Sequence, residues 1–222
     1  MDAPARRIIA NPTAGRGRTQ RLAADVAARL RSAGRRVEIR WTQFAGHAQQ
    51  IANEAVAAGV PIVVACGGDG TVQQVARALA QTDTTLGLAP GGRCDDFARA
   101  IGVGSGPGRV AQILLEGTVR RVDLGRVGDL FFCSLAAIGF DAAVSRYVDQ
   151  MRLPIKGNPA YMYGVFRMLL HYRFVPLRLT GEFGERAGAV FLAAIGNTST
   201  YGGGICISPR ARLDDGLLDI FL

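Results

Sequence analysis

A run of five residues, Gly67–Thr71, constrains the fold of this chain more than any other feature. It directly follows the apolar stretch Pro61–Cys66, which is typical of a buried strand, and it precedes residues 72–79, whose apolar positions have helical spacing. Glycines at such a strand-to-helix turn allow positive φ angles and the close approach of a bulky ligand. Because a helix N-terminus offers free N–H groups and a partial positive charge, the sequence predicts a phosphate-binding turn that contains one carboxylate, Asp69.

The first half of the chain alternates expected strands with expected helices. Strands are predicted at residues 7–10, 36–41, 61–66 and 86–89, and helices at residues 19–33, 47–58, 72–79, 95–101 and 109–115. This alternation predicts an α/β domain over residues 1–118, in which helices cover both faces of a parallel sheet. Ligands bind such sheets at the carboxyl ends of the strands.

The pattern changes after residue 118, and residues 119–222 are predicted to form a second, mostly antiparallel β domain. Its strands are expected at residues 119–127, 130–138, 177–181 and 189–195, with helices near 140–151 and 160–172. The apolar and aromatic segment 161–172 has two interpretations: a helix packed on the core of this domain, or a wall that faces acyl chains or a membrane.

Charge and composition narrow the class of partner. The 222 residues carry a net charge of +8, almost all of it from arginine, which indicates either the codon usage of a GC-rich genome or an anionic partner such as a nucleotide or anionic lipid headgroups. Nucleic acid is not expected, because no long basic run or basic–aromatic alternation occurs. A cytoplasmic location is expected, because no signal peptide is evident and apolar stretches such as Asp129–Ile138 are too short to span a bilayer. The four widely spaced cysteines are expected to be buried free thiols: Cys66, Cys94, Cys133 and Cys206.

Polar or glycine-rich turns also follow the other expected strands. Asn11–Gly15 follows the first strand, Thr42 ends the second, and Pro90–Arg99 follows the fourth. Since the carboxyl ends of parallel strands share one edge of a sheet, we expect these turns and Gly67–Thr71 to form a nucleotide pocket together.

With these motifs, the chain resembles the diacylglycerol kinase catalytic-domain family over nearly its whole length, in particular the soluble bacterial lipid kinases related to sphingosine and ceramide kinases. The matching segments, in order, are Asn11–Gly15, Thr42 with Gly46–Ala48, Gly67–Thr71, Asp96–Arg99, Ala137–Asp141, Tyr201–Gly204 and Leu213–Asp219. The resemblance implies an ATP- and Mg²⁺-dependent kinase that phosphorylates a hydroxyl group of diacylglycerol or a related lipid substrate. It also implies a three-layer α/β/α nucleotide-binding domain followed by an antiparallel β-sandwich. Peripheral contact of the arginine-rich surface with an anionic membrane is a further hypothesis.

The resemblance assigns roles to particular residues. ATP would be bound by Asn11, Pro12, Thr13, Ala14, Gly15, Thr42, Gly67, Gly68, Asp69, Gly70, Thr71, Val72, Gln73 and Gln74, and Arg93 would contact a phosphate. Asp69 and Asp96 would be the catalytic carboxylates, with Asp69 orienting the metal or the attacking hydroxyl and Asp96 lying across the cleft. A structural Mg²⁺ would be held by the Asp215 carboxylate and the carbonyl oxygens of Arg212 and Leu217, with an ion-free turn as the alternative.

Several positions depart from the family pattern. Arg93 occupies the position of a threonine that reaches the nucleotide, Asp95 that of an asparagine, and Gln74 that of a glutamate. The chain ends at Ile220–Leu222, in what would be a middle strand of an incomplete β-sandwich, and it lacks the family's late glutamate, the proposed proton acceptor. We therefore expect a fragment of a longer kinase or a shortened homologue. The alternatives are an ATP-binding regulatory homologue without catalysis and, less well supported, an NAD kinase-like enzyme with a soluble substrate.

Overall fold

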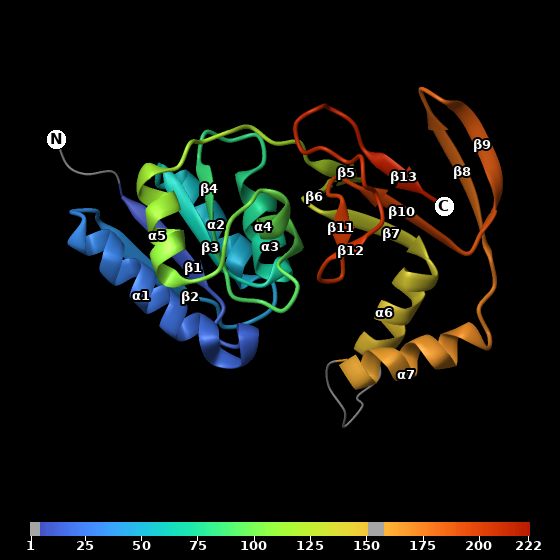
Figure 1. Ribbon diagram of the computed structural model, residues 1–222, viewed down its shortest axis with the longest axis horizontal. Helices are drawn as coiled ribbons and strands as arrows, with labels where there is room; N and C mark the ends of the chain where they lie inside the picture. Colours follow the sequence, from blue (N-terminus) through green and yellow to red (C-terminus); the bar gives the residue numbers. More distant parts are fainter. Residues whose placement is uncertain (1–4, 151–157) are drawn as a thin grey trace. The chain divides into compact units, whose positions relative to one another are not determined.

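Four parallel strands form the first sheet of the computed structural model, which describes residues 5–150 and 158–222 (Figure 1). The strands are β1 (Arg6–Ala10), β2 (Val37–Trp41), β3 (Ile62–Gly67) and β4 (Thr85–Pro90), in the order β2-β1-β3-β4. The direction of winding reverses between β1 and β3, because β1 pairs with both β2 and β3. The carboxyl ends of β1 and β3 therefore border a topological switch point, the usual ligand-binding position in such sheets.

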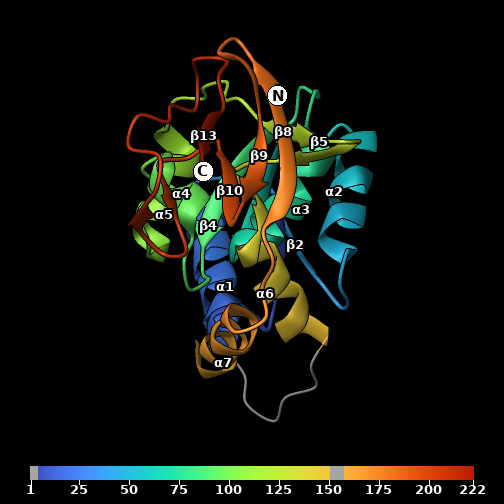
Figure 2. The ribbon, with the colours of Figure 1, turned by 90° about the vertical axis from the view of Figure 1, so that its right-hand side faces the viewer.

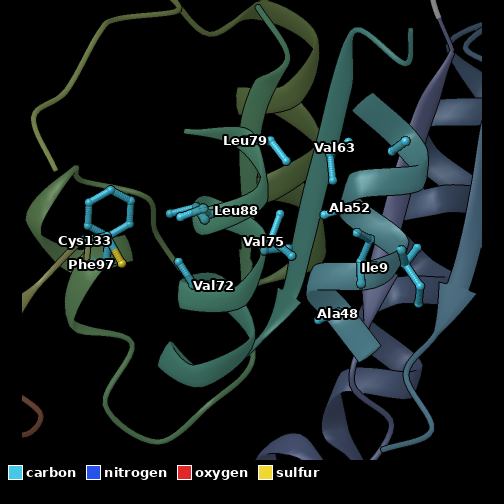
Figure 3. Packing of buried hydrophobic residues seen from close by; sticks show 14 of the residues in the cluster. Ile9, Ala48, Ala52, Val63, Val72, Val75, Leu79, Leu88, Phe97 and Cys133 are labelled. Carbon is cyan, nitrogen blue, oxygen red and sulfur yellow. The ribbon is translucent and has the colours of Figure 1, made fainter. Parts of the chain in front are cut away.

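Helices cover both faces of this sheet, as the sequence predicts. They are α1 (Arg18–Ser32), which follows the short 3₁₀ helix η1 (Ala14–Gly17), α2 (His47–Ala57), α3 (Asp69–Leu79), α4 (Asp96–Ala100) and α5 (Pro107–Glu116). Alternate strand residues point to opposite faces of the sheet. Ile8 and Val64 pack in the core beneath α1 and α5, whereas Ile9 and Val63 pack with α2 and α3 (Figure 3). The three-layer α/β/α arrangement is confirmed.

Two short hairpins complete the first compact unit, which comprises the chain up to Ser134 together with Asn197–Leu218. One hairpin pairs β5 (Gly125–Val127) with β6 (Leu130–Phe132), and the other pairs β11 (Thr200–Tyr201) with β12 (Ile205–Cys206). The limits of this unit differ from the expected domain ranges, 1–118 and 119–222, which remain predictions.

The second compact unit, Leu135–Gly196 with Asp219–Leu222, has antiparallel strand pairs throughout its described part (Figure 2). Its three-stranded sheet has the order β13 (Asp219–Phe221), β10 (Leu192–Gly196), β7 (Leu135–Gly139), and a hairpin pairs β8 (Val175–Gly181) with β9 (Gly184–Val190). The helices α6 (Phe140–Gln150) and α7 (Asn158–Leu169) lie between β7 and β8 in the chain. The expected antiparallel character of the second half is confirmed.

Helix α7 packs on α6 along one edge and is exposed along another. Gly164 is buried, and a Cβ atom there would lie 2.6 Å from Val148 Cγ2 and 3.5 Å from Val144 Cγ1. Phe166 and Leu169, by contrast, are more than half exposed. The interpretation of segment 161–172 as a helix packed on the core is therefore correct for the Gly164 edge only, and a wall that faces acyl chains or a membrane stays a prediction. No helix among residues 5–150 and 158–222 is long and apolar enough to cross a membrane.

One predicted strand, residues 130–138, is divided in two. The Cys133 N–H donates to the Gln73 side chain at 3.1 Å and not to a neighbouring strand, and the Ser134 carbonyl accepts the Asn197 N–H at 2.8 Å. These contacts end β6 at Phe132 and let β7 begin at Leu135, in the other unit. A continuous apolar run gives no sign of such a break.

Two other predicted strands are also shorter than expected. Within residues 119–127 only β5 forms. The Asp123 N–H donates to the Leu213 carbonyl at 2.6 Å, but the residues beside Asp123 are not assigned to a strand. Residues 189–195 are split between β9 and β10 at Phe191, whose ring stacks on Phe140 at a centroid distance of 4.6 Å. In both places a tertiary contact replaces strand pairing.

The prediction of buried free thiols is right for two of the four cysteines. All four are free, but Cys94 is half-buried and Cys206 is exposed. Burial raises the pKa of the Cys66 thiol to about 12 and that of Cys133 to about 11, so both stay protonated at neutral pH.

Candidate active site

Three glycine-rich turns meet where β1, β3 and β4 end: residues 11–17, 67–71 and 90–95. The Gly91 N–H donates to the Gly67 carbonyl at 3.0 Å. A Cβ atom on Gly15 would overlap the Gly91 carbonyl oxygen, and a Cβ atom on Gly92 would overlap the Gly68 Cα. The three backbones are therefore in direct contact, which side chains at these glycines would prevent.

The turn at residues 67–71 leads directly into α3, which begins at Asp69. The first N–H groups of a helix have no partner within the helix and attract anions. A Cβ atom on Gly70 would meet no atom within 4 Å, so the space beside this turn is open. An open position beside free N–H groups at a helix N-terminus is compatible with anion binding.

An arginine side chain also bridges two of the turns. Arg18 Nε donates to the Gly15 carbonyl at 3.1 Å, and its guanidinium donates to the Gly92 carbonyl at 3.4 Å. Arg16, in the same turn, is exposed and has a φ of 58°, between the left-handed Gly15 and Gly17. Arg18 therefore brings a guanidinium group to the end of the sheet where the glycine turns meet.

Asp69 holds the 90–95 turn and the start of α4 through both of its carboxylate oxygens. Oδ1 accepts the Asp96 N–H at 2.7 Å, and Oδ2 accepts the Asp95 N–H at 2.9 Å. Asp95 itself has a left-handed backbone (φ 50°), and its side chain accepts the Gly92 N–H at 3.0 Å. Aspartate tolerates this conformation nearly as well as asparagine does, which explains why the turn forms with Asp95.

Asp96 is buried directly behind this turn, with 5% of its surface exposed. Its two carboxylate oxygens accept the Gly203 N–H at 3.0 and 3.3 Å. Burial raises the pKa of Asp96 above its ordinary value, and the negative charge of Asp69 adds to this effect. The expectation that Asp96 lies across a cleft from Asp69 is wrong, because the Asp96 backbone is hydrogen-bonded to Asp69.

Asp69, Cys94 and Asp96 bring two carboxylates and a thiol together. A carboxylate oxygen of each aspartate and the Cys94 Sγ all lie within 4.8 Å of one another. Burial, followed by the charge of Asp96, raises the pKa of the Cys94 thiol, and a protonated thiol is a poor ligand for a hard cation. Each carboxylate oxygen can accept more than one contact, so both carboxylates retain lone pairs for a metal. The donor set therefore fits a hard divalent cation such as Mg²⁺ through its two aspartates.

The Gln73 side chain links α3 to the β5–β6 hairpin by hydrogen bonds. Its amide group donates to the Phe131 carbonyl at 2.5 Å, and its Oε1 accepts the Cys133 N–H at 3.1 Å. Arg77, one turn later, donates to the same Phe131 carbonyl at 2.9 Å. The side chain of Val72 lies in the hydrophobic core (Figure 3). The Val72 N–H is also engaged, because it donates to the Gly68 carbonyl at 3.1 Å. Neither side chain is therefore directed to a nucleotide in this structure.

The remaining residues expected to bind nucleotide lie around the same sheet edge. Asn11 Oδ1 accepts both the Thr13 N–H at 3.0 Å and the Thr13 hydroxyl at 2.9 Å, which shapes the first turn. The Thr42 N–H donates to the Ala10 carbonyl at 2.9 Å, so Thr42 lies beside the end of β1. Pro12, Ala14 and Gln74 are partly exposed, Arg93 is exposed, and the buried Thr71 side chain lies against Gly67.

The predicted metal-binding turn, Arg212–Leu217, is tied to an aspartate that the motif comparison did not single out. Asp123 Oδ2 accepts the Gly216 N–H at 2.7 Å, while Asp215 Oδ1 accepts the Leu217 N–H at 3.1 Å. Two carboxylates therefore lie at this turn, which suits a hard cation and equally supports an ion-free turn. The sequence signal for Asp123 is weak: one acidic residue between Val122 and Leu124.

Asn197 is a second residue that sequence reasoning missed. It is fully buried, and its Nδ2 donates to the Asp123 carbonyl at 2.7 Å and to the Cys133 carbonyl at 3.0 Å. It therefore fastens the segment after β10 to the two segments that carry Asp123 and Cys133. His47 likewise has a local role, because its Nδ1 accepts the Gln43 N–H at 3.0 Å.

The fold and this site define a class of protein. Residues 6–127 match the diacylglycerol kinase catalytic domain, and residues 134–222 match the YegS C-terminal NAD kinase beta sandwich-like domain. The first match alone covers more than half of the chain. The chain therefore belongs to the diacylglycerol kinase catalytic-domain family, as its motifs predict.

Two curated relatives show how far the similarity extends. The "Probable lipid kinase YegS-like" protein of Chromohalobacter salexigens is 36% identical over 204 residues, which cover 89% of this chain and 65% of the relative. The "Diacylglycerol kinase" of Mycobacterium tuberculosis is 36% identical over 219 residues, which cover 96% of this chain and 71% of the relative. The chain thus spans about two thirds of the length of these relatives.

Solved structures of similar proteins have the same fold. A crystal structure of a diacylglycerol kinase from Bacillus anthracis matches the whole chain with a TM-score of 0.77 at 27% identity, over 74% of its own length. A putative diacylglycerol kinase from the same organism matches with a TM-score of 0.77 at 26% identity, over 76% of its length.

Proposed function

We propose that this chain acts as an ATP- and Mg²⁺-dependent lipid kinase that phosphorylates a hydroxyl group of diacylglycerol or a related lipid. One observation carries the proposal: the turns 11–17, 67–71 and 90–95 meet at the switch point of the sheet, with Asp69 and Asp96 beside them. Membership of the diacylglycerol kinase family and the names of the relatives support the substrate class.

Phosphoryl transfer is mainly a problem of positioning and of charge neutralisation. In this proposal, backbone N–H groups of residues 67–71 bind phosphate oxygens, and Gly68 and Gly70 keep that backbone accessible. Asn11–Gly15, Thr42 and Arg93 bind the rest of the nucleotide. Mg²⁺, when bound, neutralises part of the phosphate charge.

The carboxylates have different tasks. Asp69 and Asp96 hold the cation, and Asp69 also keeps the 90–95 turn in place through its two hydrogen bonds to backbone N–H groups. The Asp215 carboxylate and the carbonyl oxygens of Arg212 and Leu217 would hold the second proposed ion. There the Asp123 carboxylate shapes the turn through the Gly216 N–H.

A transfer assay tests the proposal. We expect the chain to bind ATP with Mg²⁺ in calorimetry and to transfer labelled γ-phosphate to dioleoylglycerol in mixed micelles. Asp69→Asn and Asp96→Asn are each expected to lower transfer at least about 100-fold. Asp129→Asn, which changes a fully exposed carboxylate, is the matched control and leaves transfer unchanged.

Three outcomes separate the alternatives. Undiminished transfer in both active-site variants refutes the assignment of Asp69 and Asp96. ATP binding without transfer to any lipid would instead indicate a regulatory nucleotide-binding homologue. Transfer to a soluble nucleotide substrate in place of lipid would indicate NAD kinase-like chemistry.

A further inference from the structure

An aromatic pair lies just after β2, at the edge of the sheet that carries the candidate active site. The Phe44 and His47 rings are stacked, with their centroids 4.5 Å apart and an interplanar angle of 4°. Phe44 is nevertheless 55% exposed. Because the imidazole ring covers one face of the phenyl ring, the exposed Phe44 surface includes the opposite face.

Hydrogen bonds within the loop hold this pair in place. His47 Nδ1 accepts the Gln43 N–H at 3.0 Å, and the His47 N–H donates to the Phe44 carbonyl at 3.2 Å. Gly46, with a φ of 89°, makes the turn between the two aromatic residues just before α2 begins. The phenyl ring is therefore oriented before any ligand binds, which lowers the entropic cost of a contact with it.

The position of the pair relative to the phosphate-binding turn points to a nucleotide base. The Thr42 N–H donates to the Ala10 carbonyl at 2.9 Å, so the segment that carries Phe44 starts beside the end of β1. Strands β2 and β3 lie on either side of β1 in the parallel sheet. Neighbouring strands are about 4.8 Å apart, so the ends of β2 and β3 are separated by about 10 Å. A nucleotide whose phosphates lie at residues 67–71 can reach the end of β2 with its base.

The chemistry of the ring selects the base among the parts of a nucleotide. A phenyl ring offers no hydrogen bond to a phosphate or a sugar, whereas it stacks on the flat face of any base. Asn11 and Thr42 follow β1 and β2, between the phosphate-binding turn and Phe44, and carry the polar groups that a sugar or the edge of a base requires. A single exposed aromatic residue is ordinary on a protein surface. A preoriented ring at the ligand-binding edge of a parallel sheet is a different case.

We propose that the exposed face of Phe44 stacks on the base of the bound nucleotide and favours purine over pyrimidine nucleotides. The two fused rings of a purine cover more of the phenyl ring than the single ring of a pyrimidine does. This inference rests on the proposed binding of ATP. It adds a contact from a residue that lies outside the motifs on which the family resemblance depends, since Phe44 falls between Thr42 and Gly46.

Calorimetric titration with ADP and with pyrophosphate, which has the same two phosphates but no base, tests the proposal. Phe44→Ala is expected to bind ADP at least about fivefold more weakly than the unaltered chain does, while its affinity for pyrophosphate stays the same. Phe44→Trp restores an aromatic ring and is expected to restore the affinity for ADP. The matched control is Phe183→Ala, which removes a phenyl ring that is 47% exposed in the other compact unit and leaves both affinities unchanged.

A series of nucleoside diphosphates tests the preference for purines. The unaltered chain is expected to bind ADP and GDP more tightly than CDP and UDP. In Phe44→Ala this difference between purines and pyrimidines is expected to shrink, because the ring that senses the size of the base is gone. Phe183→Ala is expected to keep the difference in full.

A fluorescent probe tests the stacking directly. In a Trp41→Phe background, Phe44→Trp leaves a single tryptophan at the proposed contact. Its emission is expected to be quenched by ADP, whose base stacks on the indole ring, and to be unaffected by pyrophosphate. Phe183→Trp in the same background is expected to respond to neither ligand.

Each negative result would overturn the proposal. It fails if Phe44→Ala, with unchanged circular dichroism, binds ADP as tightly as Phe183→Ala does. It also fails if Phe44→Ala weakens the binding of pyrophosphate as much as that of ADP, because the residue then acts on the phosphate-binding turn or on the fold and not on the base. A failure of the proposed function looks different: the unaltered chain would then bind neither ADP nor pyrophosphate.

Discussion

Replacing Asp69 with asparagine removes a carboxylate that holds two backbone N–H groups at once. Its oxygens accept the Asp96 N–H at 2.7 Å and the Asp95 N–H at 2.9 Å. Asparagine has one carbonyl oxygen, so it can accept one of these N–H groups, and its amide group then faces the other. A hydrogen bond to a charged group is worth about 1.5–3 kcal/mol, and a buried N–H left unpaired costs about 1–3 kcal/mol.

Part of this loss is offset by relief of repulsion. Burial and, to a smaller extent, the negative charge of Asp69 raise the pKa values of Asp95 and Asp96, so removal of that charge favours the ionised forms of both neighbours. We therefore expect the free energy of unfolding of the first unit to fall by about 2 kcal/mol. For a unit of this size, the Tm would fall by about 4–8 °C.

Thermal unfolding followed by tryptophan fluorescence measures this change, because Trp41, the single tryptophan, lies in β2 of the first unit. Asp129→Asn, whose carboxylate is fully exposed, is expected to stay within about 0.5 kcal/mol of the unaltered chain. If Asp69→Asn melts at the temperature of the unaltered chain, Asp69 does not hold the 90–95 turn, and the description of the site is wrong.

Three further substitutions probe the same region. Burial raises the pKa of Asp96 in the folded chain above its value in the unfolded chain, so the folded state loses stability as the pH rises from the lower pKa to the higher one. Asp96→Asn removes this loss and is therefore expected to raise the Tm at pH 7 in calorimetry, with a smaller gain at acidic pH. Gln73→Ala leaves the Cys133 N–H unpaired, while the Phe131 carbonyl keeps its hydrogen bond from Arg77, and it is expected to cost about 1–3 kcal/mol in urea unfolding, against a near-neutral Gln74→Ala. Equal stabilities of the two variants would contradict this. Gly92→Ala places a methyl group against Gly68 and is expected to weaken ATP binding at least about tenfold in calorimetry, whereas Gly188→Ala, whose Cβ meets nothing within 4 Å, keeps the affinity. An unchanged affinity for Gly92→Ala would show that the two turns need not touch.

Much of the first unit follows from local signals. The apolar stretch before Gly67 becomes β3, the glycines after it form the turn, and the helical spacing that follows becomes α3. Parallel strands and their connecting helices are neighbours in sequence, so each signal lies within a few residues of the element that it predicts. The turns at residues 11–17, 67–71 and 90–95 also carry their own glycines, and parallel topology places them on one edge.

The site required more than these signals. Gln73 and Asp96 are conspicuous in the sequence as neighbours of glycine motifs, yet their side chains contact residues 60 and 107 positions away. Asp123 and Asn197 carry no motif, and they matter because the fold brings them to the 212–217 turn and to each other. The apolar run 130–138 is likewise divided by hydrogen bonds to residues far away in the sequence, Gln73 and Asn197.

The sequence by itself determined the strand–helix order of the first half, the antiparallel character of the second, and the family, because these depend on local spacing and on motifs. Only the tertiary structure decided that Asp69 accepts hydrogen bonds from the backbone of Asp95 and Asp96. It also decided where the predicted strands 119–127, 130–138 and 189–195 are interrupted, and which side of α7 is exposed. These features depend on hydrogen bonds and packing between distant segments. Since a buried N–H or a buried apolar face is stabilised by whatever partner the fold supplies, local sequence cannot specify it.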